Sequence, residues 1–263
     1  MRNISLITTL AFVLALAAQP QLARAQWGDL TATFVLDGKA PAVQDIVVTK
    51  DGEVCGKTMP SEGLVVNSSN GGIANIIVSL FLKETDPLPA IHDDYKKSEG
   101  DKIVLDNHKC RFEPHICVAR VGQTVVLKNS DSVGHNTKID FLTNSPINPI
   151  LPGNSQLEQK FAKEERLPTS VSCAIHPWMT AKLVVKKHPY VGVTDKDGKL
   201  TIKNLPVGKH SFVVWQEESG YVQEVKVGGK SEKWSKGRVE VTIKAGDNGL
   251  GHVVVPVSVF VKK

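Results

Sequence analysis

Several features are missing from this chain of 263 residues, and each absence excludes a class of protein. No segment shows the long apolar repeat at helical spacing, flanked by caps, that a helical bundle needs. No apolar run after residue 25 is long enough to cross a membrane, so we expect a protein that does not span one. These absences favour a fold made mainly of strands.

Motifs of common catalytic and nucleic-acid-binding sites are also missing. The chain lacks G-x-S-x-G, H-E-x-x-H, C-x-x-C-H and a glycine-rich phosphate loop, which argues against hydrolases, zinc proteases, c-type haem proteins and nucleotide-binding enzymes. The net charge of +5 is modest, and no basic stripe with interleaved aromatic residues occurs. We therefore expect no nucleic-acid partner.

The first 25 residues are typical of a secretory signal peptide. Arg2 supplies the positive start, residues 6–18 are apolar, and Ala23-Arg24-Ala25 matches an A-x-A cleavage site. An uncleaved anchor is the alternative, but the apolar stretch is short for a membrane span. Cleavage after Ala25 would leave about 238 residues with 30 basic and 27 acidic side chains, a net charge of +3. We therefore expect a periplasmic or secreted protein.

The rest of the sequence consists of short runs rich in Val, Ile and Thr, separated by clusters of Gly, Pro, Asn and Asp. Runs of this kind predict an all-β protein built from sandwiches or barrels. The predicted strands are Leu30–Leu36, Ile46–Thr49, Ile73–Leu82, Ile116–Val121, Thr124–Lys128, Leu183–Val185, Lys199–Ile202, Ser211–Trp215, Tyr221–Val227, Val239–Ile243 and Val253–Val261.

One short segment carries most of the chemical information. Residues 173–179 hold Cys173, His176 and Met179, and His135 lies upstream. An extended strand would place Met179 about 20 Å from Cys173, so these side chains can share one ion only if the segment folds back as a loop. Pro177 interrupts strand pairing there, as a loop requires. Thiolate, two imidazoles and a weak thioether form the ligand set of a blue-copper site.

At these residues the chain resembles the cupredoxins, with a short ligand loop most similar to those of amicyanin-like and methylamine-utilisation-type members. The resemblance covers about residues 101–187 and includes Phe112–His115, Val121–Val126, Asn129–Asp131 and His135-Asn136. It implies a Greek-key β-sandwich and one type 1 copper ion. The implied copper ligands are His135, Cys173, His176 and Met179.

The resemblance also implies roles for residues around the ligands. Asn136 is expected to support the thiolate sulfur, although a turn-forming asparagine is an alternative. Pro177 and Trp178 are expected to shield the metal, with plain core packing as the alternative for Trp178. His176, at the tip of the loop, is the expected electron gateway.

Four cysteines are present, and export would allow disulfides. The resemblance implies a bridge between Cys55 and Cys110. If Cys173 binds metal, one of the other three cysteines is unpaired, and Cys117 is expected to be a small buried hydrophobe. The alternative is that all four cysteines pair structurally.

The sequence divides into three blocks after the signal peptide of residues 1–25. Residues 26–100 either form a separate N-terminal β region or extend the cupredoxin sheet, and residues 101–187 hold the copper motif. In residues 188–263, the segment Asp197–Glu217 resembles carboxypeptidase-regulatory-like, transthyretin-like β modules. The pair Asp197-Gly198 predicts a hairpin turn. This last block is expected to fold as its own small sandwich.

These observations predict an exported one-electron carrier and not an enzyme. No H-x-H pair occurs, whereas a multicopper oxidase needs several for its oxygen-reducing copper cluster. The resemblance implies a redox protein partner, such as a c-type cytochrome or a membrane electron-transfer complex. Two alternatives remain open: a copper-binding protein for sequestration or delivery, and a structural or surface β protein with a non-redox site.

Overall fold

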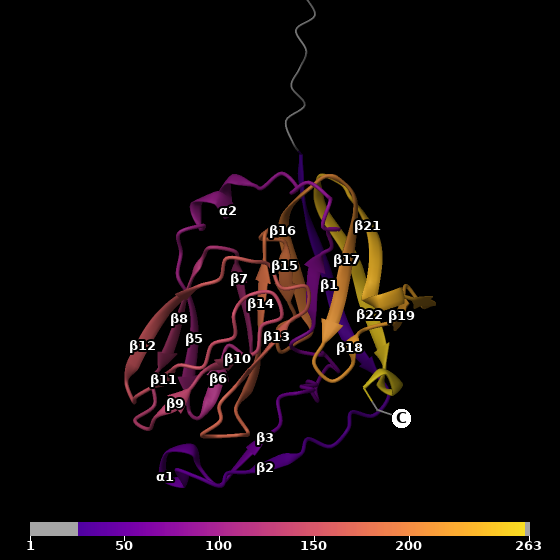
Figure 1. The fold of residues 1–263 in the computed structure, drawn as a ribbon. Helices are drawn as coiled ribbons and strands as arrows, with labels where there is room; N and C mark the ends of the chain where they lie inside the picture. Colours follow the sequence, from indigo (N-terminus) through magenta and orange to yellow (C-terminus); the bar gives the residue numbers. More distant parts are fainter. Residues whose placement is uncertain (1–25, 261–263) are drawn as a thin grey trace, which may run out of the picture.

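The computed structural model describes residues 26–260, so the predicted signal peptide lies outside the described residues. The described chain is almost entirely β, which confirms the predicted all-β sandwich class. Two β-sandwiches lie side by side, each with its own hydrophobic core (Figure 1). Across residues 26–260, no helix has the length and apolar composition needed to cross a membrane.

The middle sandwich consists of residues 103–186. One of its sheets has the strand order β10 (Lys138–Ile139), β13 (Thr169–Ser172), β14 (Thr180–Lys186) and β7 (Ile116–Arg120). The other has the order β12 (Ser155–Lys160), β8 (Thr124–Asn129), β5 (Ile103–His108) and β6 (Arg111–Glu113). A short pair, β9 (His135–Asn136) and β11 (Ile150–Leu151), closes one end.

The terminal sandwich combines both ends of the chain. One sheet has the order β16 (Lys199–Pro206), β1 (Trp27–Asp37), β22 (Gly246–Pro256), β19 (Glu224–Val227) and β20 (Lys230–Lys233). The other has the order β15 (Val191–Val193), β4 (Ile77–Leu80), β17 (Gly208–Gln216) and β18 (Gly220–Tyr221), with β21 (Arg238–Ile243) on β17. Three short helices also lie outside the two pairs of sheets: α2 (Asp93–Lys97), η1 (Ser235–Gly237) and η2 (Val257–Val259).

This arrangement differs from the three blocks predicted from the sequence. Strand β1 lies between β16 and β22, and β4 lies between β15 and β17. Residues 27–37 and 77–80 therefore belong to the sheets of the block predicted to begin at residue 188. The reason is physical: β1 exposes hydrogen-bonding groups on both edges, and β16 and β22 pair with it along most of its length, while Gly71 and Ile73 bond to its end.

The turn at Asp197-Gly198 is present, but it does not close the predicted hairpin. The strand before it, β15, pairs with β4, and the strand after it, β16, pairs with β1 in the opposite sheet. Gly198 has a φ of 76°, and its carbonyl accepts a hydrogen bond of 2.8 Å from the Phe34 amide. A Cβ at Gly198 would lie 2.2 Å from the Phe34 oxygen. The turn thus carries the chain from one sheet to the other.

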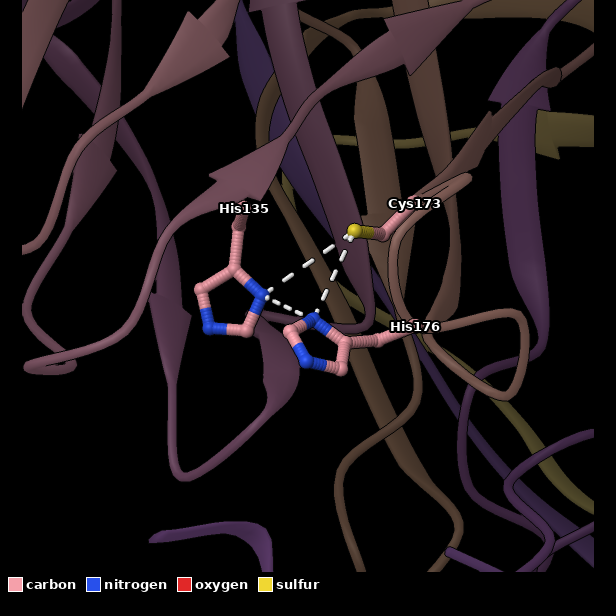
Figure 2. A group of neighbouring side chains, drawn as sticks. All are labelled: His135, Cys173 and His176. Atoms are coloured by element: carbon pink, nitrogen blue, oxygen red, sulfur yellow. Dashed lines mark hydrogen bonds between the residues drawn. The ribbon is translucent and has the colours of Figure 1, made fainter. Parts of the chain in front are cut away.

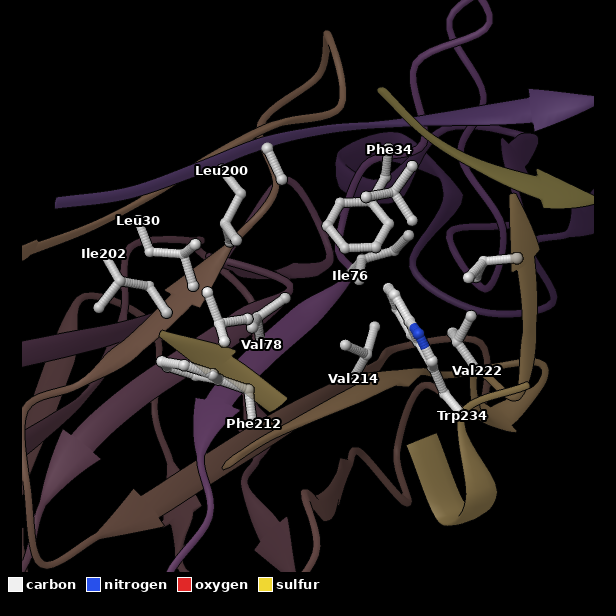
Figure 3. Packing of buried hydrophobic residues seen from close by; sticks show 14 of the residues in the cluster. Leu30, Phe34, Ile76, Val78, Leu200, Ile202, Phe212, Val214, Val222 and Trp234 are labelled. Atoms are coloured by element: carbon white, nitrogen blue, oxygen red, sulfur yellow. The ribbon is translucent and has the colours of Figure 1, made fainter. Parts of the chain in front are cut away.

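The core of the terminal sandwich follows from alternation along its strands. In β1 the side chains of Leu30, Ala32 and Phe34 point inward, and the residues between them are partly exposed. Figure 3 shows Phe34, Phe212 and Trp234 among the aliphatic side chains that fill the space between the sheets. This core contains hydrocarbon almost throughout.

A separate segment, residues 45–60, leaves the terminal sandwich and lies along the middle one. It contains β2 (Asp45–Val47), α1 (Gly52–Cys55) and β3 (Thr58–Pro60), with β2 and β3 paired as a ribbon (Figure 1). Cys55 and Met59 are buried in the core of the middle sandwich. We call residues 45–60 the strap.

The two sandwiches meet along an apolar seam. Ile77 of β4, Ile116 of β7 and Val184 of β14 form a buried cluster there. Beside it, Glu217 lies 2.6 Å from Nε2 of His115 and 3.2 Å from Nζ of Lys182. The seam thus joins residues from both sandwiches through apolar packing and one ion-pair network.

Candidate metal centre

The proposed metal ligands lie at one end of the middle sandwich. His135 is carried by β9, and the other three lie in the loop between β13 and β14. The Cys173 amide donates to the Met179 carbonyl over 3.2 Å, and the Met179 amide donates to the His176 carbonyl over 2.9 Å. These bonds fold the segment back on itself, as its spacing predicts.

Three ligand atoms converge in the interior (Figure 2). The Cys173 sulfur lies 4.0 Å from Nδ1 of His135 and 3.8 Å from Nδ1 of His176. The two Nδ1 atoms are 2.8 Å apart. His135 and His176 are 0% exposed and Cys173 is 1% exposed, so protein surrounds the cluster.

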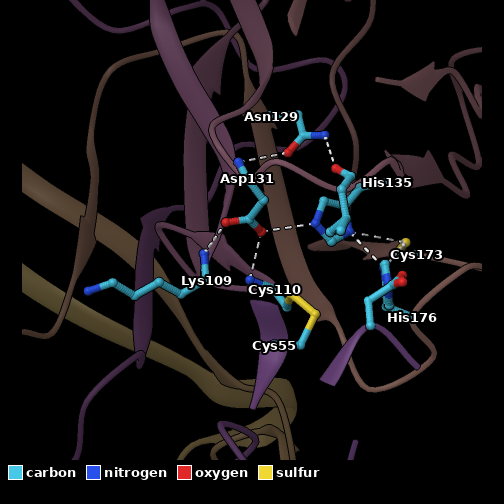
Figure 4. Close-up of a disulfide and its surroundings, with 10 residues drawn as sticks. Cys55, Lys109, Cys110, Asn129, Asp131, His135, Cys173 and His176 are labelled. Carbon is cyan, nitrogen blue, oxygen red and sulfur yellow. Dashed lines mark hydrogen bonds and ion pairs between the residues drawn. A yellow bond between two sulfur atoms is a disulfide. The ribbon is translucent and has the colours of Figure 1, made fainter. Parts of the chain in front are cut away.

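Asp131 fixes the ring of His135 from the side away from the cluster. Its carboxylate lies 2.9 Å from Nε2 of His135 and accepts backbone hydrogen bonds from Lys109 and Cys110 over 2.7 and 2.8 Å (Figure 4). Because an ionised carboxylate only accepts, Nε2 of His135 carries the proton and Nδ1 presents a lone pair. Burial lowers the pKa of His135, although the bond to Asp131 opposes that shift.

Asp51 does the same for His176, from a distant part of the chain. Its Oδ2 lies 2.8 Å from Nε2 of His176, across 125 residues of sequence. Nε2 of His176 therefore donates to Asp51, and Nδ1 again faces the cluster. Both histidines thus have a carboxylate on the outer nitrogen and Nδ1 toward the cluster, an arrangement that orients metal-ligating histidines.

This arrangement fits a metal ion. Two unprotonated Nδ1 atoms that face each other over 2.8 Å repel, unless a cation or an additional proton lies between them. The Cys173 sulfur completes a set of three inward-facing donors. A thiolate with two imidazoles is a donor set for soft or borderline metals such as copper and zinc.

Asn136 lies against Cys173, as the resemblance implies. Its backbone amide donates to the sulfur over 3.4 Å. Its side-chain oxygen lies 3.4 Å from the sulfur and accepts from the amides of Ala174 and Ile175 over 2.8 and 3.2 Å. Asn136 thereby ties the ligand loop to β9 and provides a hydrogen bond to the sulfur.

The remaining loop residues have different environments. Met179 is 1% exposed and belongs to the core of the middle sandwich. The Trp178 ring packs beside His176, with ring centroids 5.1 Å apart, whereas Pro177 is exposed. His176, the expected electron gateway, is 0% exposed, and Asp51 of the strap lies against its ring.

The four cysteines fall into one bridge and two thiols. A disulfide joins Cys55 in the strap to Cys110, with the Cα atoms 5.3 Å apart. Cys117 and Cys173 are free and buried, so the alternative in which all four pair is not the arrangement present. Burial raises the pKa of the Cys117 thiol to about 12, which makes it an inert core residue.

The sequence prediction did not identify the two carboxylates that support the histidines. Asp131 lies four residues before His135, in a stretch used only for the resemblance. Asp51 offers a weaker signal, because it lies in a different predicted block. Its position four residues before Cys55 links it to the site only once the bridge to Cys110 is known.

No protein-family model and no curated protein matches the chain. Solved structures similar to part of it include a purple cupredoxin from Nitrosopumilus maritimus, 26% identical, covering 32% of this chain and 98% of that one at a TM-score of 0.27. A reduced amicyanin variant is 25% identical over 32% of this chain and 82% of that one, with a TM-score of 0.30. A copper-containing nitrite reductase from Thermus scotoductus is 20% identical over 40% of this chain and 25% of that one, with a TM-score of 0.29.

Proposed function

We propose that this protein is an exported type 1 copper protein that carries one electron at a time, with His135, Cys173, His176 and Met179 as the copper ligands. The observation that carries this proposal is the buried convergence of one sulfur and two imidazole Nδ1 atoms, all within 4.0 Å of one another. Zinc shares this preference for sulfur and nitrogen, but the buried Met179 in the same loop favours copper, because thioethers are copper ligands.

The surrounding residues are suited to holding one geometry. Asn136 supports the sulfur, and Asp131 and Asp51 fix the two rings. Hydrogen bonds to the outer nitrogen and to the sulfur orient the ligands and tune the metal. When bound, copper supplies a one-electron Cu(I)/Cu(II) couple. A buried ligand set held by these bonds limits the rearrangement that accompanies a change of charge.

Burial of the ligands also favours a carrier over an enzyme. A substrate would need an open position beside the metal, but the three converging residues are at most 1% exposed. The cleavable leader expected from the sequence places the protein in the periplasm or outside the cell. Its partner would then be a redox protein, such as a c-type cytochrome or a membrane electron-transfer complex.

A second function, copper sequestration or delivery, is favoured by the cover over His176. A site that protects its metal is suited to storage as well as to electron transfer. The two functions differ in oxidation state. A carrier takes up both Cu(II) and Cu(I) reversibly and absorbs strongly in the visible when oxidised, whereas a delivery protein favours Cu(I) and stays colourless.

The test is the visible spectrum and cyclic voltammetry of the copper-loaded protein lacking residues 1–25. We expect an intense thiolate-to-copper band and a reversible one-electron couple. Cys173→Ser should lose the band and most of the copper affinity, because a serine hydroxyl stays protonated near neutral pH. Cys117→Ser is the matched control, since Cys117 is also free and buried but lies outside the cluster.

The outcomes separate the candidates. A colourless protein that binds only Cu(I) would support delivery, and a protein that binds no copper stoichiometrically would support the structural alternative. A spectrum that is unchanged in Cys173→Ser would overturn the ligand assignment altogether.

A further inference from the structure

The strap is an addition to the middle sandwich that comes from outside its sequence. Its ribbon and short helix lie over the ligand end, and two of its residues, Cys55 and Met59, are buried in the core there. The Cys55–Cys110 bridge fixes it covalently. The strap is therefore held in place independently of the contact that Asp51 makes with His176.

The side chain of Asp51 does not stabilise the helix that begins beside it. Asp51 is the N-cap residue of α1, where an aspartate normally accepts a hydrogen bond from the first turn of its own helix. Here it makes no such bond, and its carboxylate contacts His176. Its backbone is left-handed, with φ of 51° and ψ of 38°, a region that aspartate and asparagine tolerate better than most residues.

The contact has two consequences for the centre. It places a carboxylate on the only ring nitrogen of His176 that does not face the cluster, and with the strap it removes the ring from solvent. Asp51 is itself partly accessible, with 32% of its side chain exposed. The carboxylate therefore touches both the buried His176 ring and solvent.

We propose that Asp51 is a positioning residue of the copper centre, which holds His176 in its ligating orientation and lowers the reduction potential through its negative charge. This inference rests on the proposed function. Cu(II) carries one more positive charge than Cu(I), so a nearby carboxylate stabilises the oxidised form more. A hydrogen bond to the outer nitrogen also makes the imidazole a stronger donor. Both effects have the same sign.

The Cys55–Cys110 disulfide connects Asp51 with Asp131, the carboxylate that supports His135. Cys55 lies four residues after Asp51, and the backbone amide of its partner, Cys110, donates to Asp131. The two carboxylates that support the ligands are thus connected through one disulfide. Asp131 also accepts from the backbone amides of Lys109 and Cys110 in the turn between β5 and β6, so its substitution would perturb the fold, whereas Asp51 can be changed with less damage.

The test measures the reduction potential of copper-loaded protein in three variants. Asp51→Asn keeps the shape and tolerates the left-handed backbone but removes the charge. Asp51→Gly removes the side chain without straining a positive φ. Asp45→Asn is the matched control, because Asp45 is an exposed aspartate of the same strap.

We expect Asp51→Asn to keep the visible band and to raise the potential by at least a tenfold change in the redox equilibrium, about 59 mV for one electron. Asp51→Gly should also raise the reduction potential. It should change the visible band as well, because the His176 ring is then free to rotate. Asp45→Asn should leave both unchanged.

Failure of this inference is distinguishable from failure of the proposed function. If the unsubstituted protein shows the blue-copper spectrum but Asp51→Asn and Asp51→Gly behave like Asp45→Asn, only the role of Asp51 is overturned. A merely structural cover could change stability in these variants but would not shift the potential of Asp51→Asn. If the unsubstituted protein lacks the spectrum, the proposed function fails and this role fails with it.

Discussion

The two sandwiches differ in what they bury. The terminal sandwich encloses aliphatic and aromatic side chains with few polar ones, among them Ser79, His188 and Thr194. The middle sandwich gathers buried polar residues at its ligand end, namely Asn107, Asn129, Asp131, His135, Asn136, Thr137 and His176. Buried polar groups cost free energy unless they are hydrogen-bonded, and these bond mainly to one another and to the backbone.

The apolar core of one sandwich and the candidate metal ligands of the other therefore lie in different parts of the molecule. The terminal sandwich contributes an apolar core and no ligand. The middle sandwich has a core interrupted by a polar network, which a protein keeps where function requires it. We therefore expect changes in the terminal sandwich to affect folding with no change at the metal centre, as long as the chain remains folded.

The largest effect expected is that of truncation after Lys187. Because β1 and β4 pair with C-terminal strands, the shortened chain would leave Leu30, Phe34 and Val78 without a core. We expect residues 26–187 to be insoluble or largely unfolded, as judged by soluble yield and circular dichroism, with residues 26–263 as the control. A soluble, folded fragment with the blue-copper spectrum would instead restore the boundary predicted from the sequence.

That boundary shows where sequence reasoning stops. Strands such as Leu30–Leu36 are recognisable because alternation is a local property. The parallel pairing of β1 with β22 is not, since Gly28 and Gly246 are far apart in sequence and nothing local selects that partner. The turn at Asp197-Gly198 was found for the same local reason, but its strands pair elsewhere.

The same distinction applies to the candidate centre. Cys173, His176 and Met179 lie within seven residues, so their common loop could be predicted from spacing. His135 could be proposed from its residue type, but its position beside the loop could not, because it comes from another strand. Neither spacing nor resemblance could identify Asp51, because its contact with His176 spans 125 residues and depends on how the strap is folded.

The second prediction removes packing from the terminal core. Phe212 is 0% exposed, so Phe212→Ala should lower the free energy of unfolding by about 3–5 kcal/mol. Denaturant unfolding measures the loss, and the visible spectrum of the copper-loaded variant, recorded well below its transition, should be unchanged. A changed spectrum at full folding would mean that the two sandwiches are coupled more tightly than their separate cores indicate.

The third prediction concerns pH. Burial lowers the pKa of His188 to about 4, and the ring is held neutral because Nε2 donates to the Leu80 carbonyl and Nδ1 accepts from the Tyr190 amide. The unfolded chain takes up this proton near pH 6.5 and the folded chain only near pH 4, so the contribution is complete above 6.5 and declines as pH falls toward 4.

From pH 7 to pH 5 this difference amounts to about 2 kcal/mol of lost stability. Gln has no such proton to bind. Between pH 7 and pH 5, the free energy of unfolding of His188→Gln should therefore fall by about 2 kcal/mol less than that of the parent. Denaturant unfolding of the metal-free proteins at both pH values provides the measurement. Equal slopes in parent and variant would mean that His188 is protonated in the folded state.

The smallest effect expected lies at the seam between the sandwiches. Burial raises the pKa of Glu217, but its hydrogen bond to His115 and the charges of His115 and Lys182 outweigh burial, and the pKa lies below its ordinary value. Glu217→Gln removes the charge but keeps a side chain that can still hydrogen-bond, so we expect a loss of about 1–1.5 kcal/mol. Glu218→Gln, at an exposed neighbour, is the control.

The sign of the pH dependence makes this last prediction specific. A carboxyl whose folded pKa is depressed stabilises the fold above its unfolded pKa, and that contribution disappears as pH falls through the folded value. The difference between parent and Glu217→Gln should therefore be present at pH 7 and shrink in acid. Because the pair joins Glu217 of one sandwich to His115 and Lys182 of the other, a difference that is absent at pH 7 would mean that the apolar cluster of Ile77, Ile116 and Val184 holds the seam alone.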